Sequence, residues 1–200
     1  MSATEKNEKL LKKIKDIQAI PNAKLVFQDE VHFNVQTDIS AIWAEKGSTP
    51  IIKSKPGKDK VSYSGFVIPS TGELFTDKPD IFTFETTISS IRSFLSAYPL
   101  DEGEKYYLVM DNASWHKKAK RLIKENANGE YSDICNQVVF VPPYSPDLNP
   151  IEQVWRITRR DAKNNKYFSD KYELEDTLDS YYAVFAAPNE TLQHLCSFSF

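Results

Sequence analysis

The stretch YYLVMDNASWH, residues 106–116, joins a strand pattern to a helix pattern through an acid. Residues 106–110 form a short apolar run that is typical of a buried strand, and residues 115–123 carry an apolar stripe at helical spacing. Asp111 lies directly after the strand. Because the carboxyl ends of strands line the ligand crevice in open α/β sheets, Asp111 is a candidate for chemistry.

Further strand patterns flank this unit on both sides. Residues 24–33, 60–68 and 138–141 are rich in Val, Phe and Tyr, and we expect another strand within 34–44. The turn-forming sequence KPGK at 55–58 favours a meander between the early strands.

Apolar residues also recur at helical spacing in four more segments, at about 10–17, 88–98, 151–158 and 174–185. The first two segments are followed by prolines, which end helices. Antiparallel strands first and strand–helix units afterwards predict an α/β fold with a mixed central sheet and helices on both faces.

The composition fits an ordinary globular chain. It has 200 residues, of which 40% are hydrophobic and 26% charged, and this excludes collagenous and disordered classes. No apolar stretch approaches the roughly 20 residues that span a bilayer, and the lysine-rich start lacks the apolar segment of a secretory signal. We therefore expect a cytoplasmic protein without membrane contact. The two cysteines, Cys135 and Cys196, have no metal-type spacing, which argues against zinc.

Charge is unevenly divided along the chain. Residues 167–200 hold one base against six acids, a balance of −5, so the rest carries +2 within the overall −3. The bases of the first part form three clusters, at 53–60, 117–124 and 156–166. Each cluster suits either a phosphate backbone or a solvated surface, and its position relative to the chemistry must decide.

Two further acids lie where the expected topology brings them toward Asp111. Asp29 stands among apolar residues of the first strand, and Glu152 opens the helix after Asn149 and Pro150. Three carboxylates at one edge of the sheet form a site for Mg²⁺ or Mn²⁺, which prefer oxygen ligands. Two such ions activate a hydroxyl and stabilise the leaving oxygen in phosphoryl displacement.

Simpler interpretations remain open for each acid. Asp29 fits a half-exposed strand position, and Asp111 fits a cap of the following helix. Glu152 stands three residues after Asn149, which is the capping-box position. His32 and His194 are expected to be structural.

Three motifs together resemble one enzyme family. FQDE at 27–30, LVMDNASWH at 108–116 and VFVPPYSPDLNPIEQVW at 139–155 resemble, in order and context, the DDE endonuclease (catalytic) domain of the insertion-sequence 630 and Tc1/mariner transposase superfamily. The resemblance covers about residues 24–166 and implies a ribonuclease H-like fold. It implies that Asp29, Asp111 and Glu152 bind Mg²⁺, with Mn²⁺ as a substitute, two ions in all.

The resemblance implies hydrolysis of phosphodiester bonds at transposon ends, followed by attack of the freed 3'-hydroxyl on target DNA. It also implies a homodimer on DNA. Relatives carry a helix-turn-helix module that recognises the transposon end, and the 23 residues before the first strand are too few for one. Such a module would be separate or joined by frameshifting, and the chain itself a second reading frame, a truncated remnant or a fragment.

The expected division is a helix and linker at 1–23, the ribonuclease H-like catalytic domain at 24–188 and a tail at 189–200. Asn112 and His116 are expected to orient the metal shell or the substrate. The expected phosphate contacts, chosen because they adjoin the acids, are Lys117, Lys118, Arg156 and Arg159. Two alternatives remain: a ribonuclease H-like nuclease without strand transfer, and an inactive DNA-binding protein derived from a transposase.

Overall fold

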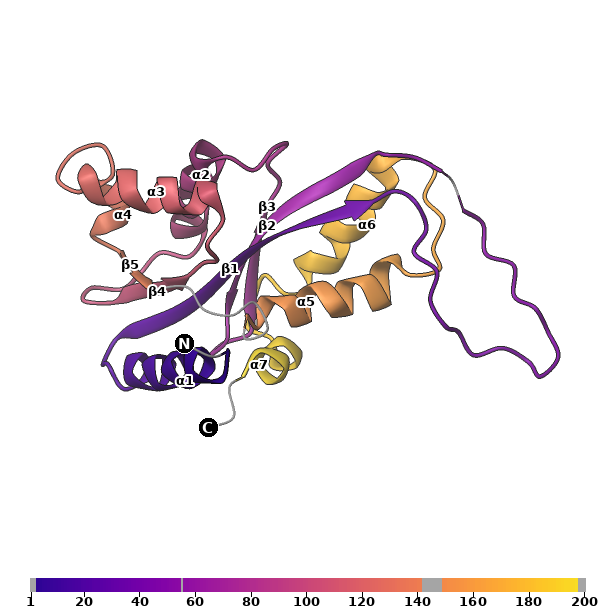
Figure 1. The fold of residues 1–200 in the computed structure, drawn as a ribbon, viewed down its shortest axis with the longest axis horizontal. Helices are drawn as coiled ribbons and strands as arrows, with labels where there is room; N and C mark the ends of the chain where they lie inside the picture. The colour runs from indigo at the N-terminus through magenta and orange to yellow at the C-terminus, as the bar shows by residue number, and fades with distance from the viewer. Residues whose placement is uncertain (1–2, 55, 142–148, 198–200) are drawn as a thin grey trace.

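A central mixed sheet organises the molecule. The computed structural model describes residues 3–54, 56–141 and 149–197, and over these residues five strands pair in the order β3-β2-β1-β4-β5 (Figure 1). The strands are β1 (Ala23–Asn34), β2 (Lys60–Ile68), β3 (Glu73–Asp77), β4 (Lys105–Val109) and β5 (Val138–Val141). The predicted mixed sheet is confirmed.

The central strand, β1, sets the topology. It pairs antiparallel with β2 and parallel with β4, and β4 pairs parallel with β5. The register places Phe27 opposite Val109. Asp29 and Asp111 each follow two residues later, so both acids lie just beyond the same end of the parallel β1–β4 ladder.

Helices cover both faces of this sheet, as the sequence predicts (Figure 1). On one face are α2 (Phe84–Ala97), α3 (Ser114–Glu125) and α4 (Ser132–Cys135). On the other are α1 (Ala3–Gln18), α5 (Ile151–Thr158), α6 (Lys171–Ala183) and α7 (Glu190–Cys196). Consecutive residues of β1 point to opposite faces of the sheet. Val26 packs in the core under α2, α3 and α4, and Phe27 packs in the core under α1, α5, α6 and α7.

Local sequence signals account for the helix ends. Thr83 caps α2 in a reciprocal arrangement with Thr86, and the helix ends at Ala97, just before Pro99. The Asp170 carboxylate accepts hydrogen bonds from the first backbone N–H groups of α6. Among the described residues, no helix is both long and apolar enough to cross a membrane.

The strand expected within 34–44 is wrong. β1 runs to Asn34, which pairs with Lys60 at the start of β2, so residues 35–59 form a long connection between two strands already in register. Its described residues contain no strand, and Figure 1 shows the connection extending away from the sheet. Trp43, fully exposed there, has no sheet to pack against.

Two other segments differ in detail from the expectation. β3 was not expected, because five residues with the pattern ELFTD carry too little alternation to predict a strand. The segment 189–200 contains α7, and this helix buries Leu192 and Cys196 in the core. Most of the proline-rich part of the 139–155 motif, residues 142–148, lies outside the described residues.

A buried lysine fastens the start of the 35–59 connection. Lys163 lies in a π-helical turn, η2 (Arg159–Lys163), and is fully buried. Its Nζ donates to the Gln36 carbonyl at 2.5 Å and lies 3.3 Å from Asp38 Oδ2. Nearby, the Asn165 side chain exchanges two hydrogen bonds with Ser40. The connection therefore leaves the core from a fixed point.

Replacing Lys163 by Met should destabilise the fold by about 1–3 kcal/mol, because it removes the donor to the Gln36 carbonyl and the cation beside Asp38. Urea denaturation measures the free energy of unfolding. Lys166→Met is the matched control, since Lys166 is exposed and bonds only a carbonyl of its own turn. Equal stability of the two variants would contradict an anchoring role.

Candidate active site

Trp155 holds the first candidate acid. Asp29 is partly buried in β1, and the indole Nε1 of Trp155 donates to Asp29 Oδ2 at 3.1 Å. The indole is buried between α5 and the sheet as part of the core. Its contact with Asp29 was not predicted.

Gly65 makes this contact possible. It pairs with Asp29 across β1 and β2, directly under the Trp155 ring. A Cβ atom at this position would lie 2.4 Å from Trp155 Cη2, too close for any side chain. The absence of a side chain at Gly65 thus lets the indole reach the carboxylate.

Glu152 lies on the first turn of α5, exposed to solvent. Asn149 Oδ1 accepts from the Ile151 backbone N–H at 3.4 Å, but among the described residues the Glu152 side chain makes no return bond, so its capping interpretation is not supported. Its charge acts on Asp29 instead. Burial is the main cause that raises the pKa of Asp29 to about 7, and the negative charges of Glu152 and Asp111 contribute to this rise.

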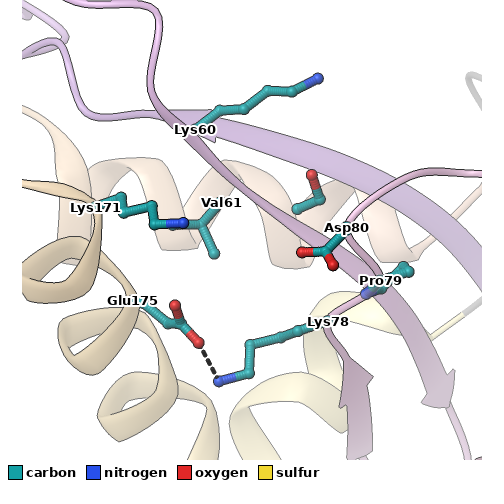
Figure 2. Close-up of a pocket in the computed structure, with 8 residues that line it drawn as sticks. Lys60, Val61, Lys78, Pro79, Asp80, Lys171 and Glu175 are labelled. Atoms are coloured by element: carbon teal, nitrogen blue, oxygen red, sulfur yellow. Dashed lines mark hydrogen bonds and ion pairs between the residues drawn. The ribbon is translucent and has the colours of Figure 1, made fainter.

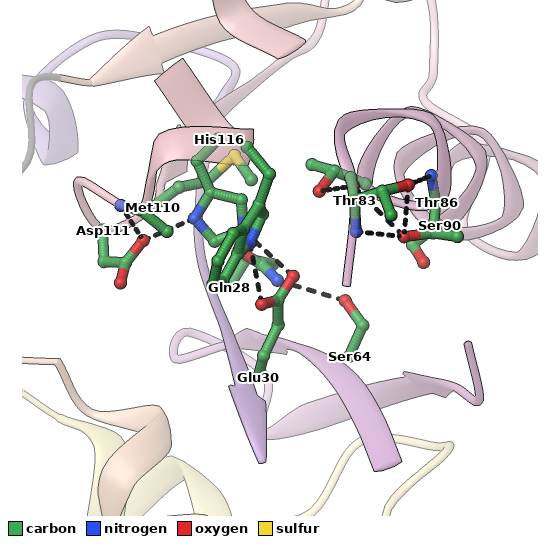
Figure 3. A network of polar contacts seen from close by, with 12 residues as sticks. Gln28, Glu30, Ser64, Thr83, Thr86, Ser90, Met110, Asp111 and His116 are labelled. Carbon is green, nitrogen blue, oxygen red and sulfur yellow. Dashed lines mark hydrogen bonds and ion pairs between the residues drawn. The ribbon is translucent and has the colours of Figure 1, made fainter. Parts of the chain in front are cut away.

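The second acid, Asp111, is held from the opposite face of the sheet (Figure 3). His116 Nδ1 lies 2.5 Å from Asp111 Oδ1, and the same oxygen accepts from the Ala113 backbone N–H at 2.9 Å. Asp111 thus bonds the residue before α3 rather than the N–H groups of its first turn. The hydrogen bond from His116 lowers the pKa of Asp111.

His116 is almost fully buried and lies between two carboxylates. Its Nε2 is 3.1 Å from Glu30 Oε1, on the side away from Asp111. Burial alone would lower the pKa of His116, but the hydrogen bonds to Asp111 and Glu30 outweigh it, so the pKa is raised. Asn112, the other residue expected to orient the site, is exposed beside Asp111.

The chemistry of these donors suits a divalent cation. All three candidate ligands are carboxylates, and their mutual repulsion contributes to the raised pKa of Asp29, which a nearby cation would lower. Among the described residues, however, no three acidic, histidine or cysteine side chains converge closely enough to hold one ion. The acids share an edge of the sheet without forming a closed shell.

Comparison with known proteins places this chain in a family. Residues 24–175 match the family described as DDE superfamily endonuclease. The chain belongs to this family. It is 34% identical over 71 residues to the uncharacterized protein y4pE/y4sA of Sinorhizobium fredii, covering 36% of this chain and 46% of that protein.

A second curated relative comes from an insertion element. The IS630 uncharacterized 39 kDa protein of Shigella sonnei is 22% identical over 150 residues, covering 74% of this chain and 41% of that protein. The DDE endonuclease chain therefore spans less than half the length of the curated relatives it matches.

Solved structures share the fold. The Mos1 mariner paired end complex with Mn superposes with a TM-score of 0.66 at 16% identity, covering 96% of this chain and 56% of that one. The catalytic domain of Mos1 mariner transposase gives a TM-score of 0.58 at 19% identity, with 96% and 83% covered. The expected ribonuclease H-like fold is thereby confirmed.

The second basic cluster divides between surface and site. Lys117 and Lys118 are exposed on α3 of the DDE domain, and Lys118 Nζ lies 3.5 Å from the centre of the Phe84 ring. Lys120 turns inward, with Nζ 3.4 Å from the backbone oxygens of both Met110 and Asp111. Burial lowers the pKa of Lys120 to about 8. Its position beside Asp111 was not predicted, because its sequence spacing matches that of its exposed neighbours.

The third basic cluster is only partly available to a ligand. Arg156 is exposed on α5, and the Arg159 guanidinium lies 5.5 Å from the centre of the Phe33 ring. Arg160 pairs with the adjacent Asp161. Lys163 is fully buried, so its assignment to a surface cluster is wrong.

A separate pocket lies at the start of β2 (Figure 2). Lys60, Lys78, Lys171 and Glu175 line it, and none of the three candidate acids does. Lys78 bridges Glu175 and Asp179, each at 2.6 Å, so its charge is already compensated. The pocket is therefore distinct from the place where the three candidate acids lie.

Asp29→Asn should stabilise the metal-free protein at pH 8. A carboxyl whose pKa rises on folding from 3.8 to about 7 favours the folded state when protonated, so stability falls as pH rises through that window. Asn carries no charge and still accepts from Trp155. We expect a melting temperature higher by about 4 °C in chelator, with the difference shrinking toward pH 4.

The control for this measurement is Asp16→Asn, at an exposed acid on α1, which should leave the melting temperature unchanged at both pH values. A melting temperature of Asp29→Asn at or below that of the wild type at pH 8 would contradict the unfavourable burial of this charge.

Proposed function

We propose that this chain is the catalytic domain of a DNA transposase, which hydrolyses phosphodiester bonds at transposon ends and transfers the 3'-hydroxyl into target DNA. One observation carries the proposal. Asp29 and Asp111 each lie two residues beyond the last pair of the parallel β1–β4 ladder, and Glu152 acts electrostatically on Asp29 from α5. Membership of the DDE endonuclease family supports it, as do structural neighbours that include a Mos1 strand transfer complex.

In this proposal Asp29, Asp111 and Glu152 hold divalent metal, two ions of Mg²⁺ or Mn²⁺. The oxygen-only donor set and the raised pKa of Asp29 support this assignment. Neighbouring Mos1 paired end complexes were solved with Mn and with Mg. When bound, such ions activate the attacking water or hydroxyl and stabilise the leaving oxygen.

The protein's own contribution is to place the acids and the DNA. Trp155 orients Asp29, and His116 orients Asp111. Lys120 adds a positive charge beside Asp111, where the phosphodiester would bind. Four basic residues are the candidates for contact with the flanking phosphates: Lys117, Lys118, Arg156 and Arg159.

The proposed partners are the transposon ends and target DNA. The chain covers less than half of its curated relatives, so recognition of the ends is assigned to a helix-turn-helix module that is separate or joined by frameshifting. Because transposition joins two ends, we expect a homodimer on DNA.

The test is a cleavage and strand-transfer assay on supercoiled and oligonucleotide DNA, with Mg²⁺, Mn²⁺ or chelator. Asp111→Asn and Glu152→Gln should each lower the rate by about 10³-fold or more, because each removes a charge from the metal site at nearly constant shape. Glu102→Gln, at an exposed acid before β4, should retain the wild-type rate. Cleavage that survives either site substitution would contradict the triad, and cleavage without joined products would favour a nuclease.

Replacing Lys117 and Lys118 together by Ala should weaken binding to all DNA sequences alike. Each phosphate contact releases about 0.9 of a counterion, so the slope of log affinity against log salt should become shallower by about 2. Fluorescence anisotropy over a salt series measures this slope. Lys12→Ala with Lys15→Ala, both exposed on α1, is the control, and loss confined to one sequence would contradict phosphate contact.

A further inference from the structure

Glu30 is a nearly buried acid that neither the metal site nor the DNA surface has so far used. Its side chain is 8% exposed, although it directly follows Asp29 in β1. Because successive strand residues point to opposite faces, Glu30 faces α3 while Asp29 faces α5. A carboxylate buried to this degree is costly without partners.

Two donors from the first turn of α3 satisfy this carboxylate. Trp115 Nε1 donates to Glu30 Oε2 at 2.9 Å, and His116 Nε2 lies 3.1 Å from Glu30 Oε1. Both oxygens are therefore engaged, each by a different ring. This fixes the carboxylate in position and orientation, and with it the plane of the His116 ring.

The opposite nitrogen of the same ring meets Asp111. Glu30, His116 and Asp111 form one continuous chain of contacts that starts in β1 and ends at the exposed edge of the sheet (Figure 3). The His116 side chain is 1% exposed and the Asp111 side chain is 49% exposed. The buried, fixed ring of His116 therefore holds the more exposed carboxylate of Asp111 in place. Without His116, this half-exposed carboxylate would keep only the hydrogen bond from the Ala113 backbone N–H.

We propose that Glu30 is a positioning residue for the metal-binding carboxylate of Asp111, acting through His116. The inference rests on the proposed function, since it gives Asp111 a metal to bind. A carboxylate that orients a histidine, which in turn orients a ligand, raises the affinity of the site without touching the ion. Trp115 completes the arrangement by holding the second oxygen of Glu30.

The competing explanation is that Glu30 merely ties α3 to β1. In that case, removing its charge would lower stability but leave the orientation of Asp111, and hence metal affinity, unchanged. Metal affinity and the state of the His116 ring therefore separate the two roles, whereas activity alone does not.

The experiment compares wild type, Glu30→Gln, Glu30→Asp, His116→Phe and the Glu30→Gln/His116→Phe double variant. Mn²⁺ dissociation constants are measured by electron paramagnetic resonance of the free ion, without DNA. Glu30→Gln offers one acceptor to two donors, and Glu30→Asp keeps the charge but withdraws it by one methylene group. Both should weaken Mn²⁺ binding about tenfold or more.

His116→Phe removes both ring nitrogens and should weaken binding to a similar degree. Because Glu30 acts through His116, the double variant should bind Mn²⁺ no more weakly than His116→Phe alone. Glu104→Gln, at an acid paired with Lys24 at the far end of β4, is the matched control and should bind as the wild type does.

Nitrogen-15 NMR of the histidine rings gives a second readout that needs no metal. The chain has three histidines, so His32 and His194 serve as internal references. In Glu30→Gln the ring signals of His116 should shift while the other two stay in place. In turnover, kcat should fall with KM for DNA unchanged.

Wild-type affinity in Glu30→Gln or Glu30→Asp, or additive losses in the double variant, would overturn the inference. So would unshifted His116 signals in folded Glu30→Gln. These outcomes leave the proposed function intact. Wild-type protein that binds no Mn²⁺ through Asp111 would instead overturn the proposed function, and this inference with it.

Discussion

The parallel pairing of β1 with β4 is the constraint on which the site depends. It brings Asp29 and Asp111 to one edge of the sheet, and α5 adds Glu152 from one face. Burial raises the pKa of Asp29, and the negative charges of Glu152 and Asp111 contribute, so an ionised Asp29 destabilises the fold. Partly buried acids that lie close together and lower the stability of the fold are typical of functional sites.

The alternation of side chains along β1 explains how two neighbouring acids acquire separate supports. Asp29 faces α5 and is held by Trp155, whereas Glu30 faces α3 and is held by Trp115 and His116. Each face of the sheet thus supplies a rigid aromatic donor. Asp111 follows β4, which lies between β1 and β5, and His116 orients it from the α3 face. The site is supported from both layers of the fold.

Sequence predicts the parts of this structure that local patterns determine. The strands around Asp29 and Asp111, the helix that ends before Pro99 and the mixed sheet follow from periodicity and turn residues. The prediction of a strand within 34–44 was wrong, because apolar content does not show whether a partner strand is present. The prediction grouped Lys120 and Lys163 with exposed bases. Sequence spacing alone does not distinguish a lysine that turns inward from its exposed neighbours. Contacts such as Trp155 with Asp29 join segments more than a hundred residues apart, and no local pattern encodes them.

The distribution of charge fits the same architecture. The acids that make the chain negative overall are concentrated after residue 166, largely on α6, which packs behind the sheet. Many of the bases lie instead on α3 and α5. The first turn of α3 follows Asp111 closely, and the first turn of α5 carries Glu152. A polyanion approaching this edge would meet Lys117 and Lys118 on one side and Arg156 on the other. Net charge is therefore a poor guide to the local electrostatic field, which is set by groups within about 10 Å.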